Sequence, residues 1–194
     1  MMDTALLVAG PTGIGKSTFL ASAADYWPPS RRPFPYSELD NTEGGVRGAR
    51  GFCLRADDIG ARVVVHVDLC TPVRALKPST REELLSALTA SLFADWYDLQ
   101  QVVSNARTVE VVTMYADRAV CFSRWLYGNH FAKNPGGGVG TPVAAILSDE
   151  ANDDELYRSL YRAWMSHVAL VAQNHLMVNA TTPDYRVVDD AVAI

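Results

Sequence analysis

The stretch Gly-Pro-Thr-Gly-Ile-Gly-Lys-Ser-Thr occupies residues 10–18 and fits the pattern G-x-x-x-x-G-K-[ST] at every specified position. The apolar run 3–8 before it suits a buried strand, and residues 16–24 are typical of the start of a helix. In this context the backbone N–H groups of the loop converge on an anion, which the helix dipole also favours. The pattern therefore predicts a phosphate-binding loop made of Gly10, Pro11, Thr12, Gly13, Ile14, Gly15, Lys16, Ser17 and Thr18.

Two side chains of this loop have expected roles of their own. Lys16 is expected to reach the β- and γ-phosphates of a nucleoside triphosphate, and the Ser17 hydroxyl is expected to ligate Mg²⁺. On Gly10, Gly15, Lys16 and Ser17 the loop resembles that of the P-loop NTPases. The resemblance implies binding of ATP or another nucleoside triphosphate together with Mg²⁺. It does not specify the reaction that follows.

Length and composition indicate one globular domain over residues 1–194, with flexible segments expected near 28–50 and 129–141. The net charge of −5 argues against a nucleic-acid binder that uses a broadly basic surface. No apolar run approaches the roughly eighteen residues of a membrane span, and the N-terminus lacks a signal-peptide pattern. Three widely spaced cysteines are typical of reduced, buried thiols. We therefore expect a cytoplasmic protein without membrane contact.

A second acidic element is expected at the end of a later strand. Residues 52–55 and 62–67 are β-rich runs that suggest a hairpin, and the second run is nearly all apolar and ends at Asp68. Ligands of open α/β sheets bind at the carboxyl ends of strands, so Asp68 is predicted to join Ser17 at Mg²⁺ or to act as a base. The alternative is a strand-end aspartate that only starts the turn before Thr71-Pro72.

Apolar spacing predicts two long helices. Capping boxes pair Ser79 with Glu82 and Thr80 with Glu83, and they precede one stripe at three- and four-residue steps: Leu84, Leu88, Leu92, Trp96, Leu99 and Val103. A second amphipathic helix is predicted to run to about Leu176, with an apolar face of Leu156, Leu160, Trp164, Val168 and Val171. A short strand is predicted over residues 185–188.

Between these helices lies a pattern of strand, turn and helix. Residues 108–115 suit a buried strand, and Asp117 is predicted to cap a helix to about Tyr127, with Ala119, Phe122 and Leu126 on one face. By position this pattern resembles the lid-bearing part of nucleoside and nucleotide kinases, where arginines approach the phosphates. The resemblance makes Arg124 a candidate catalytic residue and Arg118 a candidate nucleotide-binding residue. The glycine-rich segment 129–141 is either a closing lid or a mobile surface loop.

The order of elements predicts an α/β fold of P-loop kinase-like type, a mainly parallel sheet with helices on both faces. One function that fits is an ATP-dependent kinase acting on a small metabolite such as a nucleoside or nucleotide, with Lys16, Asp68 and Arg124 as catalytic residues. A second is a nucleotide-regulated NTPase or binding module that signals through a protein partner. A third is a protein that keeps the motif for folding alone. No N-K-x-D string supports guanine specificity.

Overall fold

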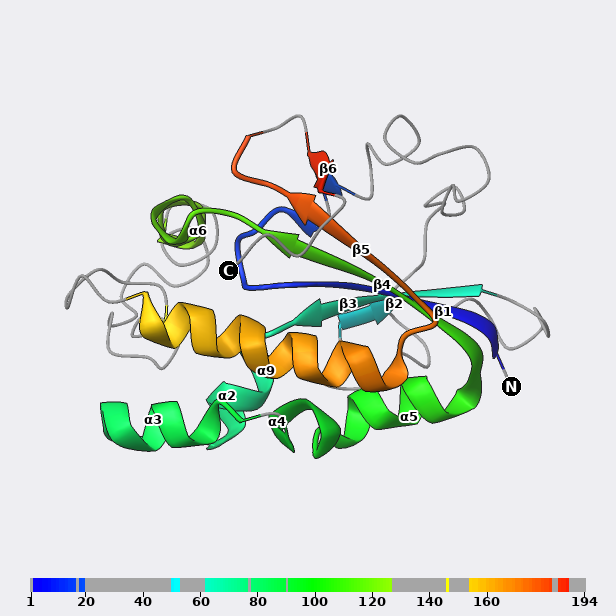
Figure 1. The fold of residues 1–194 in the computed structure, drawn as a ribbon, viewed down its shortest axis with the longest axis horizontal. Helices are drawn as coiled ribbons and strands as arrows, with labels where there is room; N and C mark the ends of the chain where they lie inside the picture. Colours follow the sequence, from blue (N-terminus) through cyan, green and yellow to red (C-terminus); the bar gives the residue numbers. More distant parts are fainter. Residues whose placement is uncertain are drawn as a thin grey trace.

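The structure is a computed structural model in which the chain forms a six-stranded sheet with the order β2-β3-β1-β4-β5-β6 (Figure 1). It describes residues 2–16, 18–19, 50–52, 62–76, 78–89, 91–126, 146, 154–182 and 185–188. The strands are β1 (Met2–Gly10), β2 (Arg50–Phe52), β3 (Arg62–Asp68), β4 (Ala106–Tyr115), β5 (Asn174–Asn179) and β6 (Arg186–Val188). The inner four strands are parallel, and β2 and β6 are antiparallel to their neighbours. The predicted α/β class with a mainly parallel sheet is confirmed.

Strand β1 lies inside the sheet because it is apolar on both faces. Leu6, Leu7 and Val8 are all buried, as expected for a parallel strand with neighbours on each side. Gly10 of β1 is in register with Asp68 of β3, and Ala9 is in register with Thr113 of β4. Parallel strands in such register end together. The phosphate-loop motif, Asp68 and the end of β4 therefore meet where the strands have their carboxyl ends.

The described helices fall into two groups (Figure 1). Five of them lie along one face of the sheet and are called the helix layer: α2 (Thr71–Leu76), α3 (Arg81–Ala87), α4 (Ser91–Ala94), α5 (Tyr97–Asn105) and α9 (Glu155–Val171). Helix α6 (Arg118–Trp125) lies beyond the end of β4. Helices were predicted on both faces of the sheet, and most of the helix predicted over residues 16–24 falls outside the described residues.

The start of α3 follows the predicted capping box. Thr80 Oγ1 accepts a hydrogen bond from the Glu83 N–H at 3.1 Å, and the Glu83 carboxylate accepts one from the Thr80 N–H at 3.3 Å. Ser79 also donates to Glu83, through its hydroxyl at 2.7 Å, instead of pairing with Glu82 as predicted. These bonds, led by that of the Ser79 hydroxyl, lower the pKa of Glu83.

The prediction of one long helix that starts at the capping boxes and carries the stripe from Leu84 to Val103 is wrong, because this segment forms α3, α4 and α5. The chain leaves helical geometry at Leu88 and again at Trp96, where ψ is 59° and 99°. These breaks turn Phe93, which lies outside the predicted apolar stripe, fully into the core. Its ring packs edge-on against Trp164 of α9, with centroids 5.1 Å apart. Packing against α9 therefore outweighs the local preference for a continuous helix.

The amphipathic helix predicted to reach Leu176 ends at Val171, and β5 was not predicted at all. The predicted apolar face is buried along most of α9, but Ala172 leaves the helix with ψ 132°. Gln173 then attaches the chain to β4, since its N–H donates to Val109 O at 2.9 Å and its Oε1 accepts from Val109 N at 2.5 Å. The apolar run 176–178 suits helix or strand, and this pairing with β4 makes it a strand.

The predicted face of α6 is only partly buried: Phe122 and Leu126 are partly buried and pack against the core. Cys121 and Trp125 are the buried residues, whereas Ala119 is exposed. Cys121 is buried because it faces α9, where its Sγ lies 3.2 Å from the Tyr157 hydroxyl. The side chains of Cys70 and Cys121 are buried, as predicted, and Cys53 lies outside the described residues.

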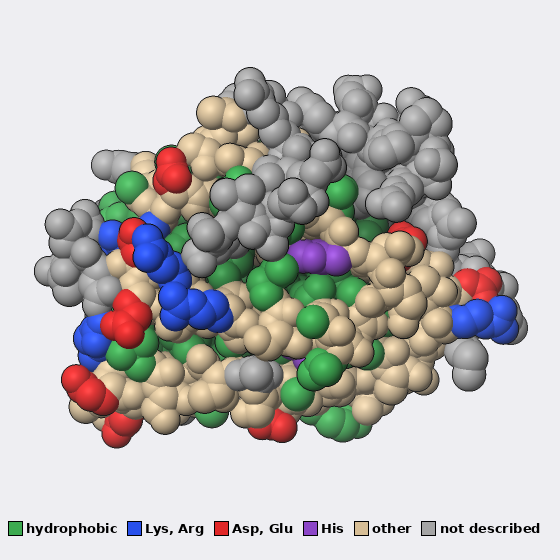
Figure 2. All heavy atoms as spheres, viewed as in Figure 1, with side chains coloured by type: hydrophobic (Ala, Val, Ile, Leu, Met, Phe, Trp, Pro, Cys, Tyr) green, Lys and Arg blue, Asp and Glu red, His purple; other side chains and the backbone are tan. Residues whose placement is uncertain are grey.

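Charged side chains of both signs gather at the left of Figure 2, over the start of α9 and the neighbouring helices. Arg81 pairs with Glu155 at 2.8 Å, and Arg118 pairs with Asp154 at 2.6 Å. Within the described residues, none of the helices has the length and apolar character required to cross a membrane.

Candidate functional site

The loop after β1 depends on glycine for its backbone path. Gly13 and Gly15 have φ values of +85° and +101°, a region that side chains with a Cβ rarely adopt. A Cβ on Gly13 would also lie 2.8 Å from the backbone nitrogen of Trp125 in α6. Ile14 is fully buried and anchors the loop in the core. The loop is therefore packed tightly between the end of β1 and the end of α6.

Lys16 folds back along this loop. Its Nζ donates to the carbonyl oxygens of Gly10 at 2.7 Å and Pro11 at 2.9 Å. The side chain is half-buried, so the ammonium group is held beside the loop. An ammonium group in this position can pair with an anion bound at the loop.

Asp68 lies directly beside the loop, as the predicted strand end requires. Its Oδ2 accepts a hydrogen bond from Thr12 Oγ1 at 2.5 Å, and its Oδ1 accepts one from the Cys70 N–H at 3.1 Å. The backbone is tied in as well, since the Leu69 N–H donates to Gly10 O at 3.3 Å. The carboxylate is thus oriented by the loop on one side and by its own turn on the other. Together, residues 10–16, Asp68 and Arg124 are called the loop edge.

His66 was not predicted as part of this site. It precedes Asp68 by two residues, so the alternation of strand side chains places both on the same face of β3. Burial, and then the charge of Lys16, lower the pKa of His66 to about 4. The imidazole is therefore neutral at physiological pH and adds no positive charge beside Lys16.

The two candidate arginines lie at opposite ends of α6, about 9 Å apart along the helix axis. Arg124 reaches the loop, where its Nη1 donates to Ile14 O at 3.3 Å. Arg118 instead donates through Nε to Asp154 at 2.6 Å. The structure thus brings Lys16, Asp68 and Arg124 together and leaves Arg118 in an ion pair. Ser17 and the glycine-rich segment 129–141 lie outside the described residues, and the Thr18 side chain is exposed.

Tyr185 is a further residue beside the loop that the sequence did not reveal. A Cβ on Gly15 would lie 3.2 Å from its hydroxyl oxygen, and its ring meets Phe19 edge-on at 5.5 Å. Its φ of +43° is rare for a bulky side chain, and such backbone strain persists only where the surroundings enforce it. The sequence predicted only a strand here, because strain and long-range packing leave no local pattern.

The donor atoms at the loop edge fit Mg²⁺ better than a transition metal. Among the residues that the structure describes, no three or more His, Cys, Asp or Glu side chains form a metal-binding group. Magnesium needs no such cage, because it is usually bound by one or two carboxylates together with phosphate oxygens and water. The oriented carboxylate of Asp68, beside the loop, could supply one such oxygen ligand.

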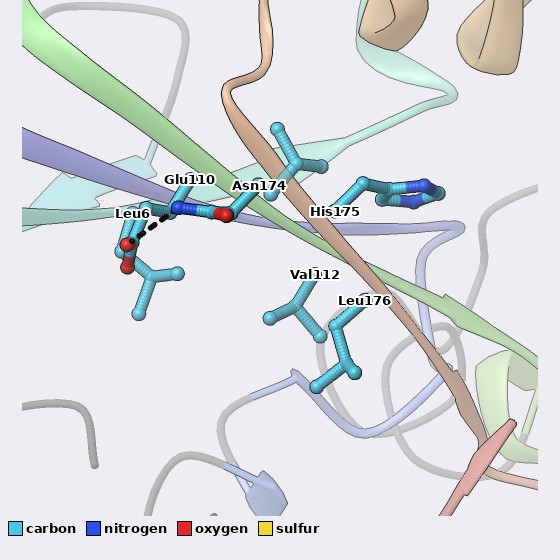
Figure 3. A pocket seen from close by; sticks show the side chains of 7 residues that line it. Leu6, Glu110, Val112, Asn174, His175 and Leu176 are labelled. Carbon is cyan, nitrogen blue, oxygen red and sulfur yellow. Dashed lines mark hydrogen bonds between the residues drawn. The ribbon is translucent and has the colours of Figure 1, made fainter. Parts of the chain in front are cut away.

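A separate open pocket of about 270 Å³, solvent space included, lies on the sheet (Figure 3). Its apolar floor includes Leu6, Val112 and Leu176, while His175 points away from them. At its rim Asn174 donates to Glu110 at 3.3 Å. Asn174 is the first residue of β5, so this rim lies towards the amino ends of the strands. The pocket is therefore distinct from the loop edge.

No family model matches this chain, and no match is found among curated proteins.

Proposed function

We propose that the chain binds a nucleoside triphosphate, ATP in the first instance, at residues 10–18 and transfers its terminal phosphoryl group to a small metabolite. The expected acceptor carries a hydroxyl or phosphate group, as nucleosides and nucleotides do. The observation that supports this most directly is the position of Asp68. Its carboxylate is hydrogen-bonded to the phosphate-loop motif itself, through Thr12.

The chemistry requires little more than positioning and charge. Loop N–H groups and the ammonium of Lys16 would hold the phosphates, and Mg²⁺ would neutralise charge on the transferring group. Ser17 and Asp68 are the residues that would hold this ion. Asp68 has a second possible use in the same place, as the base that accepts the proton of the acceptor hydroxyl.

The test is release of ADP from MgATP by the purified protein. The panel of acceptors contains nucleosides, nucleoside monophosphates, sugars and amino alcohols, and Lys16→Ala serves as the blank. Release that rises sharply with one acceptor class identifies a kinase and its substrate family. If the protein does not bind ATP, or if the parent and Lys16→Ala bind it equally well, the motif serves only in folding.

A second candidate is a nucleotide-regulated NTPase or binding module with a protein partner. It is favoured by three exposed large apolar residues in the described part of the chain, all on the helix layer: Leu76 is 54% exposed, Tyr97 71% and Leu170 80%. Single exposed apolar side chains are common, so this observation ranks below the loop edge. Slow ADP release that is indifferent to every acceptor and abolished in Lys16→Ala would favour this candidate.

A further inference from the structure

The guanidinium group of Arg124 is bound by backbone carbonyls from two distant segments. Nη1 donates to Ile14 O at 3.3 Å and to Ala180 O at 2.6 Å, and Nη2 donates to Thr181 O at 3.2 Å. Ile14 belongs to the phosphate-loop motif, whereas Ala180 and Thr181 follow β5. Arg124 therefore joins the loop to the turn after β5.

The backbone of α6 holds Arg124 in this place. Its neighbour Trp125 is buried, and the Trp125 nitrogen would lie 2.8 Å from a Cβ on Gly13, so helix and loop are in direct contact. A longer side chain at residue 13 would push α6 away. Arg124 thus reaches Ile14 from a helix end that is packed against the same loop.

The carbonyl of Ile14 shares a peptide unit with the N–H of Gly15. In a trans peptide these two groups point in opposite directions. A cation hydrogen-bonded to the carbonyl oxygen polarises the unit and strengthens the N–H on its other side as a donor. Arg124 therefore binds the Ile14–Gly15 peptide on the side opposite to the Gly15 N–H group.

We propose that Arg124 is a positioning residue that orients and polarises the Ile14–Gly15 peptide from behind, so that the Gly15 N–H binds phosphate. This inference rests on the proposed nucleotide binding. It assigns Arg124 a role different from the one expected from the sequence, in which its side chain approaches the phosphates directly.

The two roles differ in how they treat ATP and ADP. Amide groups of such a loop bind the α- and β-phosphates, which both nucleotides carry. Loss of a residue behind the loop should weaken both nucleotides equally. Loss of a side chain that contacts the γ-phosphate should weaken ATP and spare ADP.

The experiment is calorimetric titration of MgATP and MgADP into the parent, Arg124→Ala, Arg124→Lys and the control Arg162→Ala, which removes an exposed arginine of α9. Arg124→Ala should weaken both nucleotides about tenfold, the size of one charge-assisted hydrogen bond, with the ATP-to-ADP affinity ratio changed less than about twofold. Arg124→Lys keeps the charge and should recover part of the loss. The control should match the parent.

A second measurement needs no nucleotide. The amide resonance of Gly15 in ¹H–¹⁵N spectra should move in both Arg124 variants and stay in place in Arg162→Ala. If Arg124→Ala does not fold, Arg124→Lys alone carries both measurements.

Two outcomes overturn the inference while the proposed function stands. One is loss of ATP affinity with ADP affinity unchanged, and the other is parental affinity for both nucleotides in every Arg124 variant. A parent protein that binds neither nucleotide would instead remove the proposed function, and this inference with it.

Discussion

The loop edge and the helix layer are attached to the same sheet by different contacts. At the loop edge, half-buried polar side chains such as Lys16 and Arg124 bind backbone carbonyls. In the helix layer, α9 packs buried aromatic rings on β4. Tyr161 and Trp164 each donate a hydrogen bond to a residue of β4, and Tyr157 donates one to Ala116, the residue after β4. Fully buried aromatic contacts contribute far more to folding than half-buried polar ones. Substitutions at the loop edge should therefore change ligand binding, and substitutions in the helix layer should change stability.

The largest effect is expected for Trp164→Ala in the helix layer. The side chain is fully buried, packs against Phe93 and donates to Thr113 Oγ1 at 2.9 Å. Its loss should lower the free energy of unfolding by about 3–5 kcal/mol, measured by urea denaturation. Where the variant remains folded, its ATP affinity should equal that of the parent. A stable variant with weakened ATP binding would contradict the division between the two regions.

Lys16→Ala should produce the opposite pattern. The half-buried ammonium group is expected to pair with phosphate, so ATP affinity should fall by about 2 kcal/mol or more, roughly 30-fold. The free energy of unfolding should stay within about 1 kcal/mol of the parent value. Fluorescence or calorimetric titration measures the first quantity, and urea denaturation the second. Unfolding of the variant would show that Lys16 mainly holds the loop together.

His167→Leu should raise stability, because the native side chain is buried in the helix layer and neither ring nitrogen has a hydrogen-bond partner among the described residues. The expected gain is about 1 kcal/mol near pH 7.5. Burial lowers the pKa of His167 below 6.5, so the unfolded chain binds the proton more readily than the folded one. Above about pH 6.5 the histidine is neutral in both the folded and the unfolded chain, so it does not reduce the free energy of unfolding. Below that pH the unfolded chain takes up the proton first, and the free energy of unfolding falls.

Urea denaturation at pH 7.5 and 5.5 tests this prediction. The parent should lose more stability between the two pH values than His167→Leu does. His66 and His175, whose pKa values are also lowered by burial, are present in both proteins and so cancel in the comparison. Identical pH dependence of the two proteins would contradict the assignment.

The smallest effect is expected for Thr12→Val, which removes the hydroxyl that orients Asp68 and keeps the shape of the side chain. The Mg²⁺ concentration that half-saturates nucleotide binding should rise about fivefold, equivalent to about 1 kcal/mol. Nucleotide affinity without Mg²⁺ and stability should stay close to the parent values. Thr12→Ser, which keeps the hydroxyl, should restore parental Mg²⁺ dependence. Equal behaviour of the valine and serine variants would show that this hydrogen bond does not serve the metal.

The features predicted correctly from the sequence are those that depend on residues close together in the chain. The loop motif, the strand before it and the run ending at Asp68 all carry local signals, and the structure places Asp68 beside the loop as expected. The capping box of Thr80 and Glu83 is a pattern within four consecutive residues and was likewise correct.

The features that were missed depend on contacts between distant residues. The breaks at Leu88 and Trp96 carry no glycine or proline signal, and they follow from packing of Phe93 on α9. The strand β5 needs its partner β4 to be distinguished from a helix. The hydrogen bonds of Arg124 to carbonyls after β5 follow from tertiary packing that no spacing rule describes.

One carbonyl group of β4 lies against both regions. Met114 O of β4 accepts the Tyr161 hydroxyl of α9 at 2.8 Å and would lie 3.0 Å from a Cβ on Gly10. The bare backbone of Gly10 thus rests against the atom that anchors α9. In hydrogen-exchange terms, amides at the end of β1 and in the middle of α9 should open as one cooperative unit, with a common opening free energy.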